Sequence, residues 1–187
     1  MPQKRVPATV TWGLFVAWAI HDTEELIAIP RWLNHARPRL ERRLPAVPAG
    51  MWLRFSSSQE HTALAICLMG GLIAAASAAG ARTNGRSPFY QAVLTGFGAH
   101  VAVPHIASAV ITGGYTPGLL TAPTVVAPFS WWAWRKLRAA GVEKTKLPVG
   151  ALALVPVSIG AAHAGAASLL WAYRRLLKKA SNSAESR

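Results

Sequence analysis

Four of the seven acidic residues in this chain lie in or beside long apolar segments, at Asp22, Glu24, Glu25 and Glu60. An ionisable side chain is costly in an apolar, membrane-like environment and marks a functional site there by default. The densest group is the pentad His21-Asp22-Thr23-Glu24-Glu25. Because it combines an imidazole with carboxylates, this pentad is the first candidate for chemistry.

Helical geometry places three members of the pentad together. Successive residues of an α-helix advance by about 100°, so His21, Glu24 and Glu25 fall within an arc of about 100° on one face. Asp22 lies at the margin of this face, where we expect a structural role. The group suits a divalent metal ion, for which Zn, Fe and Mn are the candidates. It suits proton transfer equally well, since burial and crowding favour protonated carboxyl groups. In a purely structural interpretation, the acids are solvated at the membrane interface or pair with Arg31.

The second apolar segment begins with Glu60 and His61. We expect His61 to lie near His21, because the end of the first segment and the start of the second share one membrane face. Glu60 is explained equally well by a capping box, Ser57-Ser58-Gln59-Glu60, in which Ser57 is the N-cap. His61 is therefore a predicted metal ligand, whereas Glu60 has no assigned role.

The third apolar segment contains His100 and His105. Five residues correspond to about 140° on an α-helix, so the two histidines are not expected to share a face unless Pro104 kinks the helix. We favour His105 as the ligand, because it lies deeper in the segment. Tyr115 is in the turn that follows, at the face where the first segment ends, and is a candidate catalytic residue. His163 stands among Gly and Ala, and we expect it to pack between helices.

The elements that must position these residues are five apolar segments. A helix needs about 20 residues to cross a bilayer, and the predicted spans are 8–29, 57–81, 88–112, 117–134 and 147–173. Hydrophobic residues make up 52% of the chain and charged residues 14%, against about 25% charged in soluble domains. The sequence therefore predicts an all-α polytopic membrane bundle of about five transmembrane helices. Residues 1–175 form a single domain, and residues 176–187 form a basic, disordered tail.

The basic residues are confined to the connections and ends of the predicted spans. All 20 Lys and Arg lie in blocks beside the predicted spans, which gives a net charge of +13. In these positions they meet anionic lipid headgroups, and the blocks lack the interleaved aromatics of single-stranded nucleic-acid binding. The bilayer is the expected partner, and nucleic acid is not. The side that carries the C-terminus holds 11 basic residues against 9, which predicts a cytoplasmic C-terminus in the cell membrane.

Two motifs within the five predicted spans and their connections resemble those of the HXXEE domain family of membrane proteins. The first is the pentad at the end of the first apolar segment. The second is His105 followed by Tyr115-Thr116-Pro117-Gly118-Leu119-Leu120-Thr121-Ala122, which is similar to the family's later His and its Tyr-x-Pro-Gly…Thr-Ala turn. The resemblance covers nearly the whole chain. The family has an Asn shortly before its later His, where this chain reads His100-Val101. The resemblance implies a metal-dependent membrane enzyme without specifying a reaction.

Three functions fit these observations. The first is an intramembrane metalloenzyme, a hydrolase or an oxidoreductase, that acts on a small lipophilic substrate through metal ligands or acid–base groups at His21, Glu24, Glu25, His61 and His105. The second is a metal-free isomerase or cyclase in which Glu24 or Glu25 moves a proton and Trp18 and Tyr115 stabilise a cation. The third is a proton or metal transporter, or an accessory protein. Clustering of the acids at one membrane face argues against the third.

Overall fold

The computed structural model describes residues 4–43, 45, 58–146 and 153–185, and these residues form helices and connecting turns without any strand. The chain begins with α1 (Ala8–Thr11) and the long α2 (Gly13–Arg43). It continues through α4 (Gln59–Arg82), α5 (Pro88–Ala99), the π-helix η1 (Val101–Ala107) and α6 (Ser108–Thr112). A turn then leads to the π-helix η2 (Ala122–Val126), to α7 (Ala127–Ala139) and, after a connection, to α8 (Leu154–Glu185).

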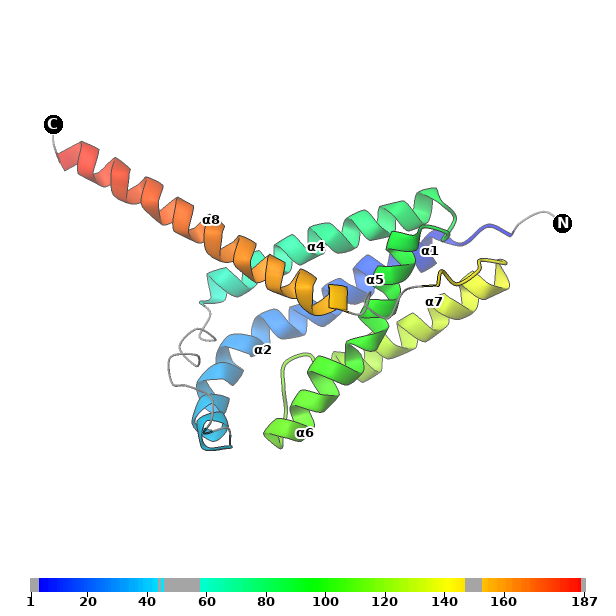
Figure 1. Cartoon of the computed structure of the whole chain (residues 1–187), viewed down its shortest axis with the longest axis horizontal. Helices are drawn as coiled ribbons and strands as arrows, with labels where there is room; N and C mark the ends of the chain where they lie inside the picture. The colour runs from blue at the N-terminus through cyan, green and yellow to red at the C-terminus, as the bar shows by residue number, and fades with distance from the viewer. Residues whose placement is uncertain (1–3, 44, 46–57, 147–152, 186–187) are drawn as a thin grey trace.

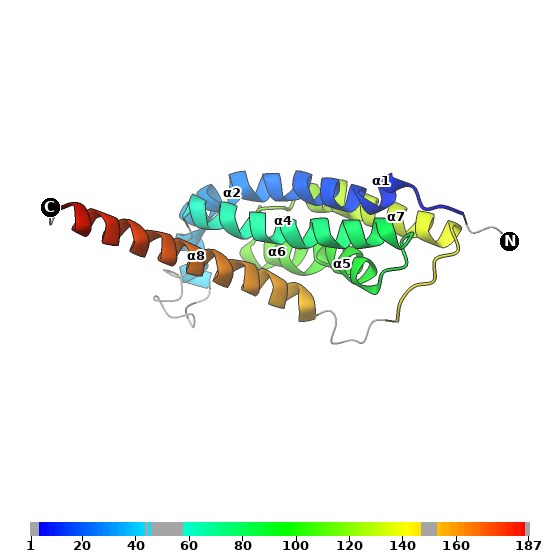
Figure 2. The ribbon, with the colours of Figure 1, turned by 90° about the horizontal axis from the view of Figure 1, so that it is seen from above.

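The helices pack as a bundle in which α2 and α4 lie side by side (Figure 1). Helix α5 packs against α4 and α7, and α8 packs against the outer side of α4. The second half of α8 projects beyond the other helices in both views of the ribbon (Figures 1 and 2). The unit that surrounds the candidate site consists of α1–α2, α4, α5–η1–α6 and η2–α7.

The core forms where α2 meets α5 and α7. One cluster of fully buried side chains contains Val10 from α1, Leu14 from α2, Leu94 from α5 and Leu137 from α7. The Tyr90 hydroxyl donates a hydrogen bond of 2.7 Å to the carbonyl of Val10, which ties α5 to α1. Burial of these large side chains provides the main free energy that holds the helices in place.

Small residues on α4 permit this close packing. A β-carbon at Gly70 would lie 2.7 Å from the Trp18 ring, and one at Gly80 would lie 2.6 Å from the Tyr90 ring. Glycine therefore allows α4 to approach two aromatic side chains of the core, as the Gly- and Ala-rich composition of this segment predicts. The N-cap of α4 is Ser58, which accepts from the His61 backbone N–H at 3.3 Å. The cap thus lies one residue later than the predicted N-cap, Ser57, which is outside the described residues.

Three described helices are long and apolar enough to cross a membrane: Gln59–Arg82, Pro88–Thr112 and Leu154–Ser183. These correspond to three of the five predicted spans, so the all-helical class is confirmed and the count of five is not. The first predicted span, 8–29, covers α1 and the first part of α2, and α2 continues through Pro30 to a basic last turn at Arg42 and Arg43. The predicted span 117–134 begins as a turn and becomes helical only at η2.

The C-terminal segment also differs from the sequence prediction. Residues 176–185 continue α8 as a helix, where a disordered tail was expected. This stretch contains Leu, Lys and Ala, which favour helix, and it lacks Gly and Pro, which interrupt helices.

Candidate metal centre

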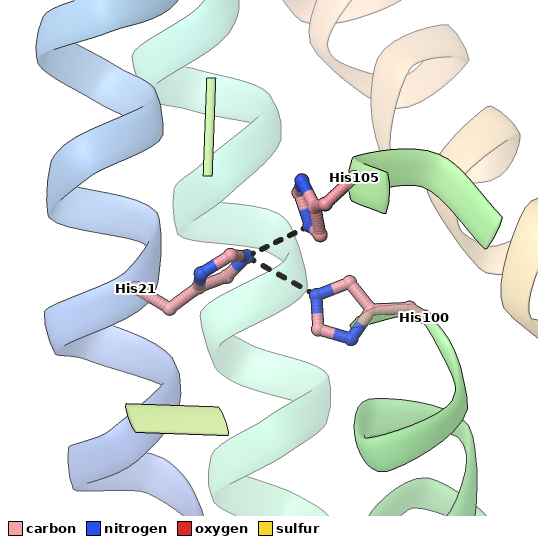
Figure 3. A group of neighbouring side chains, drawn as sticks. All are labelled: His21, His100 and His105. Carbon is pink, nitrogen blue, oxygen red and sulfur yellow. Dashed lines mark hydrogen bonds between the residues drawn. The ribbon is translucent and has the colours of Figure 1, made fainter. Parts of the chain in front are cut away.

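Three histidine side chains from two elements converge inside the bundle (Figure 3). His21 comes from the first third of α2, and His100 and His105 come from the junction of α5 with η1. The Nε2 atom of His21 lies 3.1 Å from His105 Nε2 and 3.1 Å from His100 Nε2. His21 is 1% exposed and His105 is 3% exposed. Together the three rings form a group whose nitrogen atoms are close enough to hold one metal ion.

Hydrogen bonds on the opposite side of each ring fix which nitrogen carries the proton. His105 Nδ1 lies 2.9 Å from the carbonyl oxygen of Pro117, and His100 Nδ1 contacts the carbonyl oxygen of Phe97. A carbonyl only accepts, so in both rings Nδ1 carries the hydrogen and donates it. In the neutral imidazole, Nε2 is then an unprotonated acceptor.

His21 is oriented in the same way through a hydroxyl group. Its Nδ1 lies 2.7 Å from Thr121 Oγ1, and that hydroxyl donates its own hydrogen to Glu24 Oε2 at 2.6 Å. The hydroxyl therefore accepts from His21 Nδ1, which leaves His21 Nε2 unprotonated as well. As a result, three neutral imidazoles direct three acceptor atoms at one another. Acceptors that are buried without a donor are unfavourable, and a cation placed among them removes the conflict.

The ring geometry distinguishes this cluster from an ordinary pair of hydrogen-bonded histidines. His61 and His163 form such a pair, with Nε2 and Nδ1 2.9 Å apart and ring centroids 5.2 Å apart. In the cluster, the nitrogen atoms of His21 and His105 are farther apart, at 3.1 Å, yet their centroids are closer, at 4.7 Å. The two rings are therefore not in line with each other, unlike the rings of His61 and His163.

Glu25 is the carboxylate that faces the cluster. Its Oε1 lies 3.8 Å from the Nε2 atoms of both His21 and His105. Its side chain is 24% exposed, whereas those of the two histidines are almost fully buried. With Asp22, which is buried, Glu25 also completes a second potential ligand group around His21. Glu25 therefore occupies the place of a fourth ligand or of a proton acceptor beside the ion.

Glu24 does not belong to either potential ligand group of the described residues. Its Oε2 accepts from the Thr121 hydroxyl at 2.6 Å and from the Thr121 backbone N–H at 2.9 Å. Its Oε1 accepts from the Tyr115 hydroxyl at 2.6 Å and from the Leu120 backbone N–H at 3.3 Å. Four donors therefore occupy the carboxylate that the sequence predicts to be a ligand, and Glu24 instead binds the turn after α6 to α2.

Tyr115 is likewise positioned by this turn. Burial and the neighbouring Glu24 carboxylate raise the pKa of the Tyr115 hydroxyl above its ordinary value, so the hydroxyl stays protonated and donates. The Trp32 indole N–H donates to the Tyr115 carbonyl at 2.6 Å and provides a second attachment to α2. The contacts of Tyr115 make it part of the support for the site.

Gly118 allows the turn to pass over two of the histidine rings. Its φ of +82° lies in the left-handed region, where glycine is favoured. A β-carbon at this position would also lie 2.8 Å from Cε1 of His21 and closer still to the ring of His105. Both the backbone conformation and the space therefore require glycine at this point of the Tyr-x-Pro-Gly turn.

The π-helix η1 explains why His100 and His105 meet. In a π-helix the repeating hydrogen bond joins residues five apart, so such residues lie close to one turn apart. The α-helical angle of about 140° therefore does not apply across Val101–Ala107. The sequence left the role of His100 open, and the signal that could have identified it is the spacing of two histidines around Pro104.

The other sequence candidates lie elsewhere. His61 pairs with His163 of α8, and it belongs to neither potential ligand group of the described residues. The prediction that a shared membrane face would bring His61 to His21 is not met, because the start of α4 directs this ring toward α8. Trp18 is buried in the core against Gly70. Thr121 received no role from the sequence, although it is the Thr of the matched Tyr-x-Pro-Gly…Thr-Ala turn, and it joins Glu24 to His21.

Comparison with known proteins adds one match. A family model described as "Protein of unknown function with HXXEE motif" matches residues 12–133, which is more than half of the chain. No curated protein and no solved structure matches. The matched region contains the three clustered histidines, both glutamates and the turn from Tyr115 to Thr121, and it ends before α8.

Proposed function

This chain belongs to the HXXEE family, and from that premise we propose that His21, His100 and His105 form the metal centre of an intramembrane enzyme. The observation that carries the proposal is the convergence of three Nε2 atoms whose rings are each held through Nδ1. Ligating histidines in proteins almost always donate their second ring N–H in this way, because the bond fixes the tautomer and the ring orientation.

The donor set favours particular ions among Zn, Fe and Mn. Three imidazoles suit Zn and Fe, whereas Mn prefers sites richer in oxygen ligands. Such an ion supplies Lewis-acid or redox chemistry to a bound water or substrate. Glu25 is placed to accept a proton beside it, since its carboxylate lies 3.8 Å from two of the ligand nitrogens. Thr121 and Glu24 hold the His21 ring in its ligating tautomer.

The surroundings of the centre support a small lipophilic substrate. The helices that carry the histidines expose large apolar side chains: Ile20 and Ile27 on α2, and Val103 and Ile106 on η1. Val103 is 72% exposed. Because such side chains are stable when lipid covers them, a substrate dissolved in the bilayer would approach the centre through an apolar environment.

Elemental mass spectrometry of the detergent-purified chain tests the metal centre. We expect about one Zn or Fe per chain in the unmodified protein, and loss of that metal in H21A, H100A and H105A. The controls are H61A and H163A, which remove an imidazole from the α4–α8 pair and should retain the metal. Metal that persists in the cluster variants, or a folded protein without metal after growth with ample Zn, Fe and Mn, would refute the proposal.

A second experiment separates an enzyme from a metal carrier. The metal-loaded chain and its E25Q variant are incubated with a lipid extract of the source membrane, and the products are compared by mass spectrometry. An enzyme gives a product that E25Q does not form, once elemental analysis has shown that E25Q carries the same amount of metal as the unmodified chain. If neither protein forms a product but the unmodified chain moves the metal across a proteoliposome membrane, the centre belongs to a transporter.

A further inference from the structure

The end of α8 is a helical segment that the rest of the bundle leaves uncovered. Between Trp171 and Ser183 every described side chain is exposed. The segment projects past the start of α4 and away from the other helices (Figures 1 and 2). It also lies beyond residue 133, where the family match ends. The segment is therefore independent of the metal centre and needs an explanation of its own.

One face of this segment is basic. At about 100° per residue, Arg175, Lys178 and Lys179 fall within one third of the helix circumference, together with Trp171 before them and Asn182 after them. These five side chains line a shallow groove along the helix. The Arg175 guanidinium lies over the Trp171 ring, 4.4 Å from its centroid. The groove thus combines three cationic groups with an aromatic ring at its beginning.

The opposite face is apolar and equally open. Tyr173 and Leu177 lie on it, and Leu177 is 53% exposed, while Leu176, which is 67% exposed, lies between this face and the groove that it also lines. This segment is the last part of the helix Leu154–Ser183, which is long and apolar enough to cross a membrane, so it reaches headgroup depth as the helix leaves the bilayer. At that depth apolar side chains enter the acyl boundary and long cationic side chains reach the phosphate groups. Trp and Tyr, which begin this segment, are the residues enriched at that depth.

The membrane surface explains both faces at once. An acidic protein or a nucleic acid would neutralise the basic face but leave Tyr173 and Leu177 in water. Nucleic acid also needs successive stacking aromatics, whereas Trp171 is the single aromatic residue among those that line the basic groove. We propose that residues 171–183 of α8 bind anionic phospholipid headgroups, with Arg175, Lys178 and Lys179 on the phosphates and the apolar face in the bilayer.

Native mass spectrometry of the full chain in detergent tests this proposal. The protein is titrated with phosphatidylglycerol and with phosphatidylcholine, and bound lipids are counted. We expect phosphatidylglycerol to bind about tenfold more tightly or better, because each basic residue near an anionic surface contributes appreciably. The variant R175Q/K178Q/K179Q should lose that preference, and higher salt should reduce it in the unmodified chain.

The matched control is R135Q/K136Q/R138Q on α7. It removes the same charge, and Arg135 lies over Trp131 as Arg175 does over Trp171, but the apolar face of α7 is buried through Ala133 and Leu137. We expect this control to keep most of the preference for phosphatidylglycerol. An equal loss in both variants would show a general charge effect and overturn the proposal.

Two further measurements complete the test. The variant L176Q/L177Q should bind phosphatidylglycerol more weakly, whereas an unchanged affinity would contradict the role of the apolar face. Tighter binding of a single-stranded oligonucleotide than of phosphatidylglycerol would assign the basic face to nucleic acid instead. Helical circular dichroism and a single elution peak establish folding, and the single variants K178Q and K179Q replace the triple variant if it does not fold.

Discussion

The imidazole rings of His100 and His105 lie edge to face with their centroids 4.9 Å apart, although the two residues are five positions apart in the sequence. An α-helix would direct these two side chains to different faces, and the π-helix between them brings them together. The geometry of the candidate metal centre therefore depends on one local departure from α-helical hydrogen bonding. π-Helical turns of this kind occur frequently at functional sites.

Substitution of Pro104 tests this dependence. Proline lacks the backbone N–H that an α-helix needs at this position, so P104A should allow the segment to return to α-helical geometry and separate the two rings. We expect metal content to fall well below one ion per chain in P104A. The control is P156A in α8, away from the clustered histidines and from the turn that supports them. Full metal content in P104A would show that proline is not what maintains the π-helix.

Thr121 should determine how tightly the centre holds its ion. T121V removes the hydroxyl that accepts from His21 and donates to Glu24, and loss of such a support costs about 10–100-fold in metal affinity. T121S keeps the hydroxyl and should remain within a few-fold of the unmodified chain. Competition with a chelator of known affinity measures both variants. Equal affinities for T121V and T121S would rule out the hydroxyl as the support of His21.

Gly118 should be intolerant of any side chain. A left-handed backbone costs a residue other than glycine about 1–2 kcal/mol, and in G118A the new methyl group would also displace the rings of His21 and His105. We expect G118A to lower the thermal unfolding midpoint and to lose metal. Gly71 is the control, because no atom lies within 4 Å of a β-carbon built there. G71A should be neutral or slightly stabilising, since alanine favours helix.

Tyr115 should make the free energy of unfolding decrease as the pH rises through the alkaline range. Its pKa is raised in the folded chain, so the protonated hydroxyl favours folding below the ordinary tyrosine pKa of about 10. This contribution is lost as pH rises from there through the raised pKa. Y115F should lower the free energy of unfolding by about 0.5–1.5 kcal/mol near neutral pH. The difference should shrink above pH 10 when unfolding is followed by circular dichroism, and a constant difference up to pH 11 would argue against the bond to Glu24.

The sequence by itself determined the helical class, the bounds of one helix that is long and apolar enough to cross a membrane, and the placement of His21 beside Glu25. The predicted segment 88–112 coincides with Pro88–Thr112. Hydrophobic length and composition are local properties, so such segments can be read without knowing their neighbours. The helical arc that groups His21 with Glu25 is equally local, and the structure retains it. Family membership follows from two short motifs and is confirmed.

Only the tertiary structure decided which of these residues meet. A helical arc specifies the face on which a side chain lies but not the element that packs against that face. Glu24 shares the face of His21, yet the Tyr115–Thr121 turn occupies its carboxylate. His61 begins α4 at the expected end, yet α8 packs there and supplies His163 as its partner. Helix packing selects these contacts through interactions between residues about 80–100 positions apart, which the periodicity of a single segment does not encode.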